Sequence, residues 1–185
     1  MMEDQLNINS DSRQPALISH ADHFTYAEMD KTTARIAARL GQAGVKEGQR
    51  VAVRVRLHPD FPLLFFALLR AGALTVPLNP DLPEATAAAM GRQAGCQWLI
   101  NLDNNPTGLP GMTVIEPKQW RSWNTETETP AIKDIVDLAQ PATILFSSGS
   151  SGRPRAILHT VGHHYFSALG SNRNLQMVTG DRWLV

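Results

Sequence analysis

The chain has 185 residues, of which 43% are hydrophobic, so it can bury one well-covered core, and its length suggests a single globular domain. Its 17 basic and 17 acidic side chains cancel, which removes the long-range field that would draw it to nucleic acid or to an anionic membrane. We therefore expect no nucleic-acid partner.

The sequence carries no secretory signal that we recognise, because residues 1–13 are polar and lack an apolar core. The longest apolar run, Phe61–Leu69, is about half as long as a membrane helix, and Arg70 follows it. Cys96 is the only cysteine, which excludes an internal disulfide, and its neighbours indicate a small buried side chain rather than a catalytic thiol. We expect a soluble cytoplasmic protein without a membrane span.

The first predicted element is a helix that begins at a capping box formed by Thr25 and Glu28. Apolar residues then recur at a spacing of three to four as far as Leu40, and Gly41 or Gly44 ends the helix. The alternation that follows, over Val51–Leu57, is typical of a strand.

Strands and helices continue to alternate after this point. The predicted elements are a helix over Pro59–Ala71 closed by Gly72, a strand over Ala73–Pro77, a helix from Pro83 to Ala94 closed by Gly95, and a strand over Gln97–Asn101. This order predicts an α/β fold, a layered and mainly parallel sheet with packed helices.

Residues 102–141 are predicted to form an irregular connection, in which only Met112–Ile115 has the pattern of a strand. Order returns with strands over Ala142–Phe146 and Ala156–His159 and a helix over Gly162–Leu175. Asp181–Val185 has the composition of the start of a buried strand. Since a domain rarely stops at such a point, we expect residues 1–185 to be a truncated domain.

The segment that carries chemistry follows the strand that ends at Phe146. It reads Ser147, Ser148, Gly149, Ser150, Ser151, Gly152, Arg153, Pro154, Arg155. Glycines allow close approach of the backbone, hydroxyls donate to phosphate oxygens, and an arginine can clamp them, so these are phosphate-binding groups. Composition alone favours a bland Ser/Gly surface loop, and the order of the residues decides against it. The segment is not a Walker loop, because G-x-x-x-x-G-K-[ST] is absent and a strand follows instead of a helix.

The order of residues in this loop resembles the signature of the adenylate-forming superfamily, [ST]-S-G-[ST]-T-G-x-P-K-[GA]. The departures are Ser151 for threonine, Arg155 for lysine and Ala156 for the commoner glycine. Arginine keeps the charge of lysine but replaces a compact ammonium with a planar fork. The resemblance extends over Phe24–Glu28, Val45–Val53 and Leu68–Asn79, and Ile157–Ala168 is most similar to o-succinylbenzoate:CoA ligases of menaquinone biosynthesis.

The resemblance implies the amino-terminal (AMP-binding) part of the large domain of an AMP-forming carboxylate:CoA ligase, with the carboxy-terminal domain absent. It implies ATP, Mg²⁺ and a small carboxylic acid as reactants, and CoA as co-substrate. It assigns the ATP phosphates to Ser147, Ser148, Gly149, Ser150, Ser151, Gly152 and Arg155. The family's magnesium ligands, ribose aspartate and catalytic lysine would lie beyond Val185, so no catalytic residue and no metal ligand is assigned within the chain. We expect this chain alone to be inactive and to self-associate.

Two other interpretations stay open at this stage. The chain can be a stand-alone nucleotide-binding or interaction module without catalysis, or part of another acyl- or aryl-CoA synthetase. His159 and His163 lie four residues apart, but a strand-to-helix junction separates them and no H-E-x-x-H motif is present, so packing roles are favoured over a zinc site.

Overall fold

The structure is a computed structural model, and it describes residues 5–7, 12–19, 22–102, 108–116, 135–148, 154–176, 178 and 180–182. The strands are β1 (Gln5–Asn7), β2 (Pro15–Ile18), β3 (His23–Thr25), β4 (Arg50–Arg54), β5 (Leu74–Leu78), β6 (Trp98–Asn101), β7 (Thr113–Ile115), β8 (Ile135–Asp137), β9 (Pro141–Ser147) and β10 (Arg155–Thr160). The helices are α1 (Tyr26–Gln42), α2 (Phe61–Arg70), α3 (Glu84–Ala94) and α5 (Val161–Leu175).

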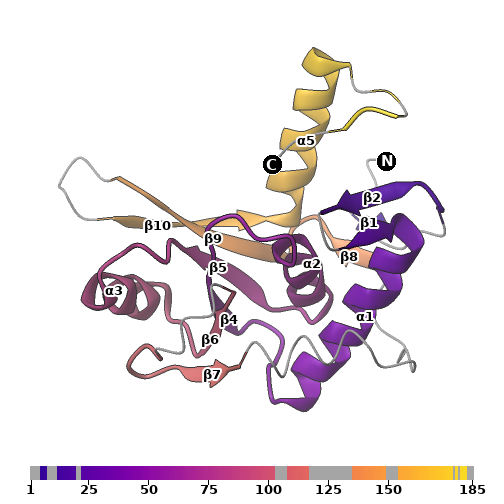
Figure 1. The fold of residues 1–185 in the computed structure, drawn as a ribbon. Helices are drawn as coiled ribbons and strands as arrows, with labels where there is room; N and C mark the ends of the chain where they lie inside the picture. Colours follow the sequence, from indigo (N-terminus) through magenta and orange to yellow (C-terminus); the bar gives the residue numbers. More distant parts are fainter. Residues whose placement is uncertain are drawn as a thin grey trace.

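A six-stranded sheet forms the centre of the fold, in the order β10-β9-β5-β4-β6-β7 (Figure 1). All neighbouring strands are parallel except β9 and β10, which form an antiparallel hairpin. The predicted α/β fold with a mainly parallel sheet is therefore confirmed. Two small antiparallel pairs, β1 with β8 and β2 with β3, were not predicted.

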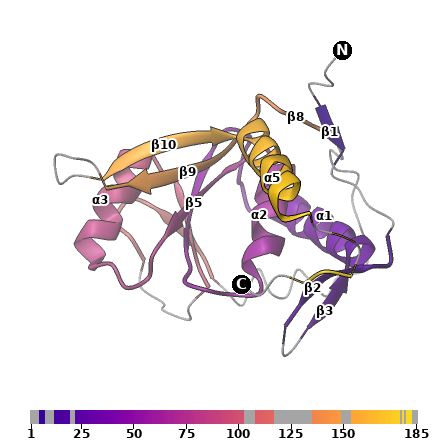
Figure 2. The ribbon, with the colours of Figure 1, turned by 90° about the horizontal axis from the view of Figure 1, so that it is seen from above.

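The sheet is buried on both faces by helices (Figures 1 and 2). On β4, Val51 and Val53 belong to one apolar cluster with α1 and α2, whereas Ala52 between them belongs to another with α3. Successive side chains of a strand point to opposite faces, so this division places α1 and α2 on one face and α3 on the other. The result is a three-layered α/β/α arrangement.

The residues whose local pattern predicted the helix ends also form them in the structure. Thr25 accepts a hydrogen bond from the Glu28 backbone N–H at 3.2 Å, and Glu28 Oε2 accepts from the Thr25 N–H at 2.8 Å, which confirms the capping box. Gly95 ends α3 at φ 70°, a left-handed conformation that favours glycine. Cys96 is buried, as expected, and burial raises the pKa of its thiol to about 12.

The strand predicted over Val51–Leu57 was predicted too long. β4 ends at Arg54, because the chain turns away after Val55 and leaves the Leu57 side chain 67% exposed. In the sequence, apolar and polar residues continue to alternate beyond Arg54, the last residue of β4 that pairs with a neighbouring strand. The pattern therefore predicted a strand that was too long. α2 begins at Phe61, two residues later than predicted. Asp181 and Arg182 lie in no strand, and the rest of the strand predicted over Asp181–Val185 lies outside the described residues.

A buried ion pair joins the two helices on one face of the sheet. Arg70 of α2 donates to the carboxylate of Asp30 of α1, and the Arg70 side chain is 2% exposed. Removing Asp30 would leave the buried Arg70 charge uncompensated, so this contact supports the packing of α1 against α2. No helix among the described residues is long and apolar enough to cross a bilayer.

Candidate phosphate-binding site

The described ends of the predicted phosphate loop lie together at one end of the β9–β10 hairpin. Ser147, the last residue of β9, pairs with Arg155, the first residue of β10. Paired residues on neighbouring antiparallel strands direct their side chains to the same face. The Ser147 hydroxyl and the Arg155 guanidinium therefore leave the hairpin on one side. Since Arg155 is exposed and Ser147 is half-buried, both groups are open to a ligand in solution.

The other predicted phosphate ligands are only partly described. Ser148 directly follows β9 and is exposed. Gly149, Ser150, Ser151 and Gly152 lie outside the described residues, so their assignment to the ATP phosphates stays a prediction.

The direction of β9 places Ser147 and Arg155 at the edge of the sheet where the parallel strands have their carboxyl ends. β9 runs parallel to β5, with Thr143 opposite Thr75, so Ser147 lies towards the carboxyl ends of the parallel strands. In open α/β sheets, ligands bind outside the carboxyl ends of the strands. Hydroxyl and guanidinium groups at this edge fit an anionic, phosphate-bearing ligand.

A helix distant in sequence also reaches the end of the loop. The side-chain amide of Gln93, on α3, donates a hydrogen bond to the backbone carbonyl of Pro154, with 3.1 Å between Nε2 and O. Pro154 directly precedes Arg155. Sequence reasoning did not find this residue, because 61 positions separate the two partners and Gln93 belongs to no motif.

Three histidines lie together at the opposite end of the hairpin. The ring centroid of His159, on β10, is 5.7 Å from that of His163 and 5.8 Å from that of His164, both on α5. His163 Nδ1 accepts a hydrogen bond from the Thr160 N–H, which caps α5. His164 Nε2 lies 2.9 Å from Thr143 Oγ1.

The contacts of this histidine cluster connect α5 with β9 and β10. The described residues contain no group of three or more His, Cys, Asp or Glu side chains arranged to hold a metal ion. His159 is four strand residues from Arg155, about 13 Å along β10. The cluster therefore joins α5 to the sheet and does not extend the phosphate site.

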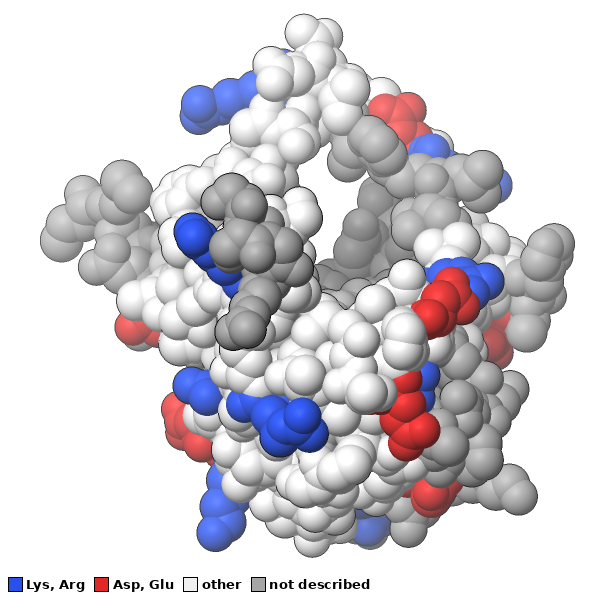
Figure 3. All heavy atoms as spheres, turned by 90° about the vertical axis from the view of Figure 1, so that its left-hand side faces the viewer, with Lys and Arg blue, Asp and Glu red and all other residues white. Residues whose placement is uncertain are grey.

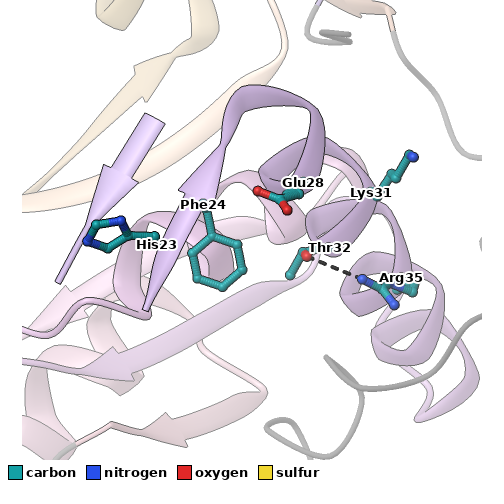
Figure 4. A pocket seen from close by; sticks show the side chains of 6 residues that line it. All are labelled: His23, Phe24, Glu28, Lys31, Thr32 and Arg35. Atoms are coloured by element: carbon teal, nitrogen blue, oxygen red, sulfur yellow. Dashed lines mark hydrogen bonds between the residues drawn. The ribbon is translucent and has the colours of Figure 1, made fainter. Parts of the chain in front are cut away.

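A hollow of about 290 Å³ lies between β3 and α1 (Figure 4). It is lined by His23, Phe24, Glu28, Lys31, Thr32 and Arg35. The Glu28 carboxylate is engaged by the Thr25 cap, and Arg35 donates to the Thr32 hydroxyl at 3.3 Å. Its ionic groups are therefore of both signs and partly engaged in helix contacts, and none of them comes from the loop.

Charges on the face that carries the hairpin end are mixed. Lysine and arginine atoms are interspersed with aspartate and glutamate atoms among the described residues, without a broad field of one sign (Figure 3). This distribution accords with the balance of 17 basic and 17 acidic side chains. This face therefore offers an anion local groups such as Arg155 rather than a long-range potential.

Comparison with known proteins gives a consistent result. Residues 5–185 match the family model described as AMP-binding enzyme. The 2-succinylbenzoate–CoA ligase of Listeria monocytogenes serotype 4b (strain F2365) is 26% identical over 184 residues, which cover 97% of this chain and 38% of that protein.

Solved structures of a Bacillus subtilis enzyme have the same fold. Its o-succinylbenzoate coenzyme A synthetase in complex with AMP superposes with a TM-score of 0.83 at 25% identity, over 94% of this chain and 45% of that one. The same synthetase in complex with the acyl-adenylate intermediate also gives 0.83 at 25% identity, over 94% of this chain and 36% of that one. The chain thus spans less than half the length of these relatives.

Proposed function

The chain belongs to the AMP-binding enzyme family, and from this premise we propose that it is the amino-terminal part of an ATP-dependent carboxylate:CoA ligase that forms an acyl-adenylate. The observation that carries the proposal is the pairing of Ser147 with Arg155 at the base of the signature loop. This pairing brings a hydroxyl and a cation to the carboxyl edge of the sheet, where a polyphosphate needs both.

The proposed reaction has two steps. A substrate carboxylate oxygen attacks the α-phosphorus of ATP, the bond to the β-phosphate breaks, and pyrophosphate leaves. The CoA thiolate then attacks the acyl carbon of the adenylate, and AMP leaves as the thioester forms. Neither step needs a side-chain nucleophile, so catalysis depends on positioning and on stabilisation of charge.

In this scheme the residues of the loop hold the β- and γ-phosphates. Arg155 contributes the positive charge, and Ser147 and Ser148 contribute hydroxyl donors from the described part of the loop. We assign Gly149 and Gly152 to backbone approach, and Ser150 and Ser151 to further donors. We assign Mg²⁺ mainly to residues of the longer enzyme, because the resemblance to the adenylate-forming family implies that its magnesium ligands lie beyond Val185.

For the acid we propose o-succinylbenzoate. Support comes from the relatives, one of which is named 2-succinylbenzoate–CoA ligase. A panel of succinylbenzoate, fatty and aryl acids, assayed for AMP release with the full-length enzyme, tests this choice. A faster reaction with a fatty or aryl acid would overturn the substrate and leave the reaction class in place.

We also propose that these 185 residues alone do not complete the reaction. The chain spans 38% of the length of a related ligase, and losing residues that position the reactants removes an effective molarity worth up to about 7–11 kcal/mol. The test incubates the purified chain with ATP, Mg²⁺, CoA and o-succinylbenzoate and follows AMP, beside a full-length enzyme. Turnover near the full-length rate would refute the proposal, whereas phosphate binding without turnover agrees with it.

A further inference from the structure

We propose that Gln93 is a positioning residue that sets the orientation of Arg155 in the phosphate site. This inference rests on the proposed function, since it gives Arg155 the task of binding phosphate. Its structural basis is the hydrogen bond from the Gln93 amide to the Pro154 carbonyl at 3.1 Å. Figures 1 and 2 both show α3 beside the end of the hairpin at which β10 begins.

Gln93 projects from a part of α3 that is firmly attached to the sheet. The buried residues of α3 are Ala87, Ala88, Gly91 and Ala94. At the end of the helix, Arg50 of β4 donates to the Ala94 carbonyl at 2.9 Å, and the Cys96 N–H donates to the Gly91 carbonyl at 2.9 Å. The Gln93 side chain therefore has a fixed origin, although its amide is near the surface.

The acceptor of this hydrogen bond determines what Gln93 can control. The carbonyl of Pro154 belongs to the same planar peptide unit as the Arg155 N–H. The proline ring also fixes φ of Pro154 near −65°, so little freedom remains at this residue. Holding the carbonyl oxygen therefore orients the peptide plane from which the Arg155 side chain begins.

A second contact restrains the same position. Arg155 pairs with Ser147 across the hairpin, so β9 restrains Arg155 itself and the Gln93 amide of α3 restrains the peptide unit that precedes it. Because a guanidinium binds phosphate through a planar fork, its affinity depends on orientation more than that of a lysine ammonium does. A contact that fixes the orientation of the side chain therefore matters more for an arginine at this position than for the lysine usual in the signature.

The test measures binding of Mg²⁺-pyrophosphate to the ¹⁵N-labelled 185-residue chain, with the Arg155 amide resonance as the reporter. Gln93→Met keeps the length of the side chain but removes the N–H donor. We expect about three- to tenfold weaker binding and a shifted Arg155 amide, which corresponds to the loss of one hydrogen bond. Gln93→His retains an N–H donor and is expected to recover part of the affinity.

Thr86→Ala is the matched control, since Thr86 is an exposed polar residue on the same helix and lies two turns away. Urea unfolding of each variant separates positioning from stability, and we expect Gln93→Met to unfold like the control. Pyrophosphate binding that is unchanged in Gln93→Met would overturn the role of Gln93 and leave the proposed function standing. Absence of pyrophosphate binding by the wild-type chain would overturn both.

Discussion

Arg155 is the residue on which the proposed chemistry depends most among those described. It replaces the lysine of the signature loop and lies exposed, opposite Ser147. A guanidinium supplies charge and two parallel donors to a phosphate, and such charge-assisted hydrogen bonds are stronger than neutral ones. At this position the chain thus keeps the charge of the family signature in a group whose hydrogen-bonding geometry is stricter than that of lysine.

We predict that Arg155→Ala slows ATP–pyrophosphate exchange by a full-length enzyme about 10- to 100-fold, the loss of one charge-assisted contact. Affinity for the carboxylic acid should change much less, because in the proposed mechanism the loop contacts phosphates and not the acyl group. Arg155→Lys should retain more activity than Arg155→Ala, since the charge remains. Equal losses of exchange rate and acid affinity would show that Arg155 has only a structural role.

Protonation of His164 is expected to make the stability of the folded chain depend on pH. Burial lowers the pKa of His164 below its usual range, and the neighbouring His159 and His163 lower it further. The neutral ring is therefore favoured in the folded state. The stabilisation from His164 is fully present above the unfolded-state pKa of about 6.5 and is lost progressively as the pH falls below that value.

We predict that the free energy of unfolding decreases between pH 7.5 and pH 5.5, and that His164→Gln reduces this decrease. Urea unfolding at the two pH values measures it. His23→Gln, at an exposed position on β3, is the control for loss of a histidine elsewhere. The same pH dependence in wild type and His164→Gln would contradict the assignment.

At the scale of elements, α5 is attached to the fold mainly by its first turn. Among its residues only Val161 and Gly162 are buried, and the Gly162 N–H donates to the Leu138 carbonyl at 2.8 Å. His164 adds its contact with Thr143. The remainder of the helix extends away from the sheet, as Figure 1 shows. Stability of this element therefore depends on a few close contacts.

Two glycines on α5 give a matched pair of substitutions. A Cβ at Gly162 would lie 3.0 Å from the Leu138 carbonyl oxygen, whereas a Cβ at Gly170 would meet nothing within 4 Å. We predict that Gly162→Ala destabilises the chain by about 1–2 kcal/mol through crowding. Gly170→Ala should stabilise the helix by up to about 1 kcal/mol, because alanine has the higher helix propensity. Urea unfolding measures both, and equal signs would contradict the proposed attachment of α5.

At the scale of the whole molecule, large apolar side chains are exposed on the hairpin and on α5. They are Leu145, Ile157, Leu158, Phe166, Leu169 and Leu175. Ile157 and Leu158 are adjacent on β10 and so point to opposite faces, yet they are 43% and 49% exposed. Among the described strands, β10 is also an edge of the six-stranded sheet. An uncovered apolar edge strand favours association.

We predict that the 185-residue chain self-associates through this surface. Sedimentation velocity over a range of concentrations should show species larger than a monomer, and Leu158→Lys should shift the distribution towards monomer. Leu57→Lys is the control, because Leu57 is 67% exposed but lies outside the hairpin and α5. A monomer at every concentration, or an equal effect of both substitutions, would refute this role of the hairpin.

The sequence by itself determined the elements whose signals are local. The Thr25 capping box, the glycines that end α2 and α3, and the alternation of apolar strands with helices predicted the α/β fold, and the structure confirms it. The loop motif likewise identified the family, because the motif consists of nine consecutive residues and can be recognised from their order alone.

Only the tertiary structure decided the contacts between distant segments. The pairing of β1 with β8, the end of β4 at Arg54, the contact of His164 with Thr143 and the contact of Gln93 with Pro154 all depend on which surfaces meet after folding. The local pattern of the sequence does not predict these contacts, since Gln93 and Pro154, for example, lie 61 positions apart. Local hydrogen bonding and periodicity fix the elements, whereas packing of the sheet against its helices selects their neighbours.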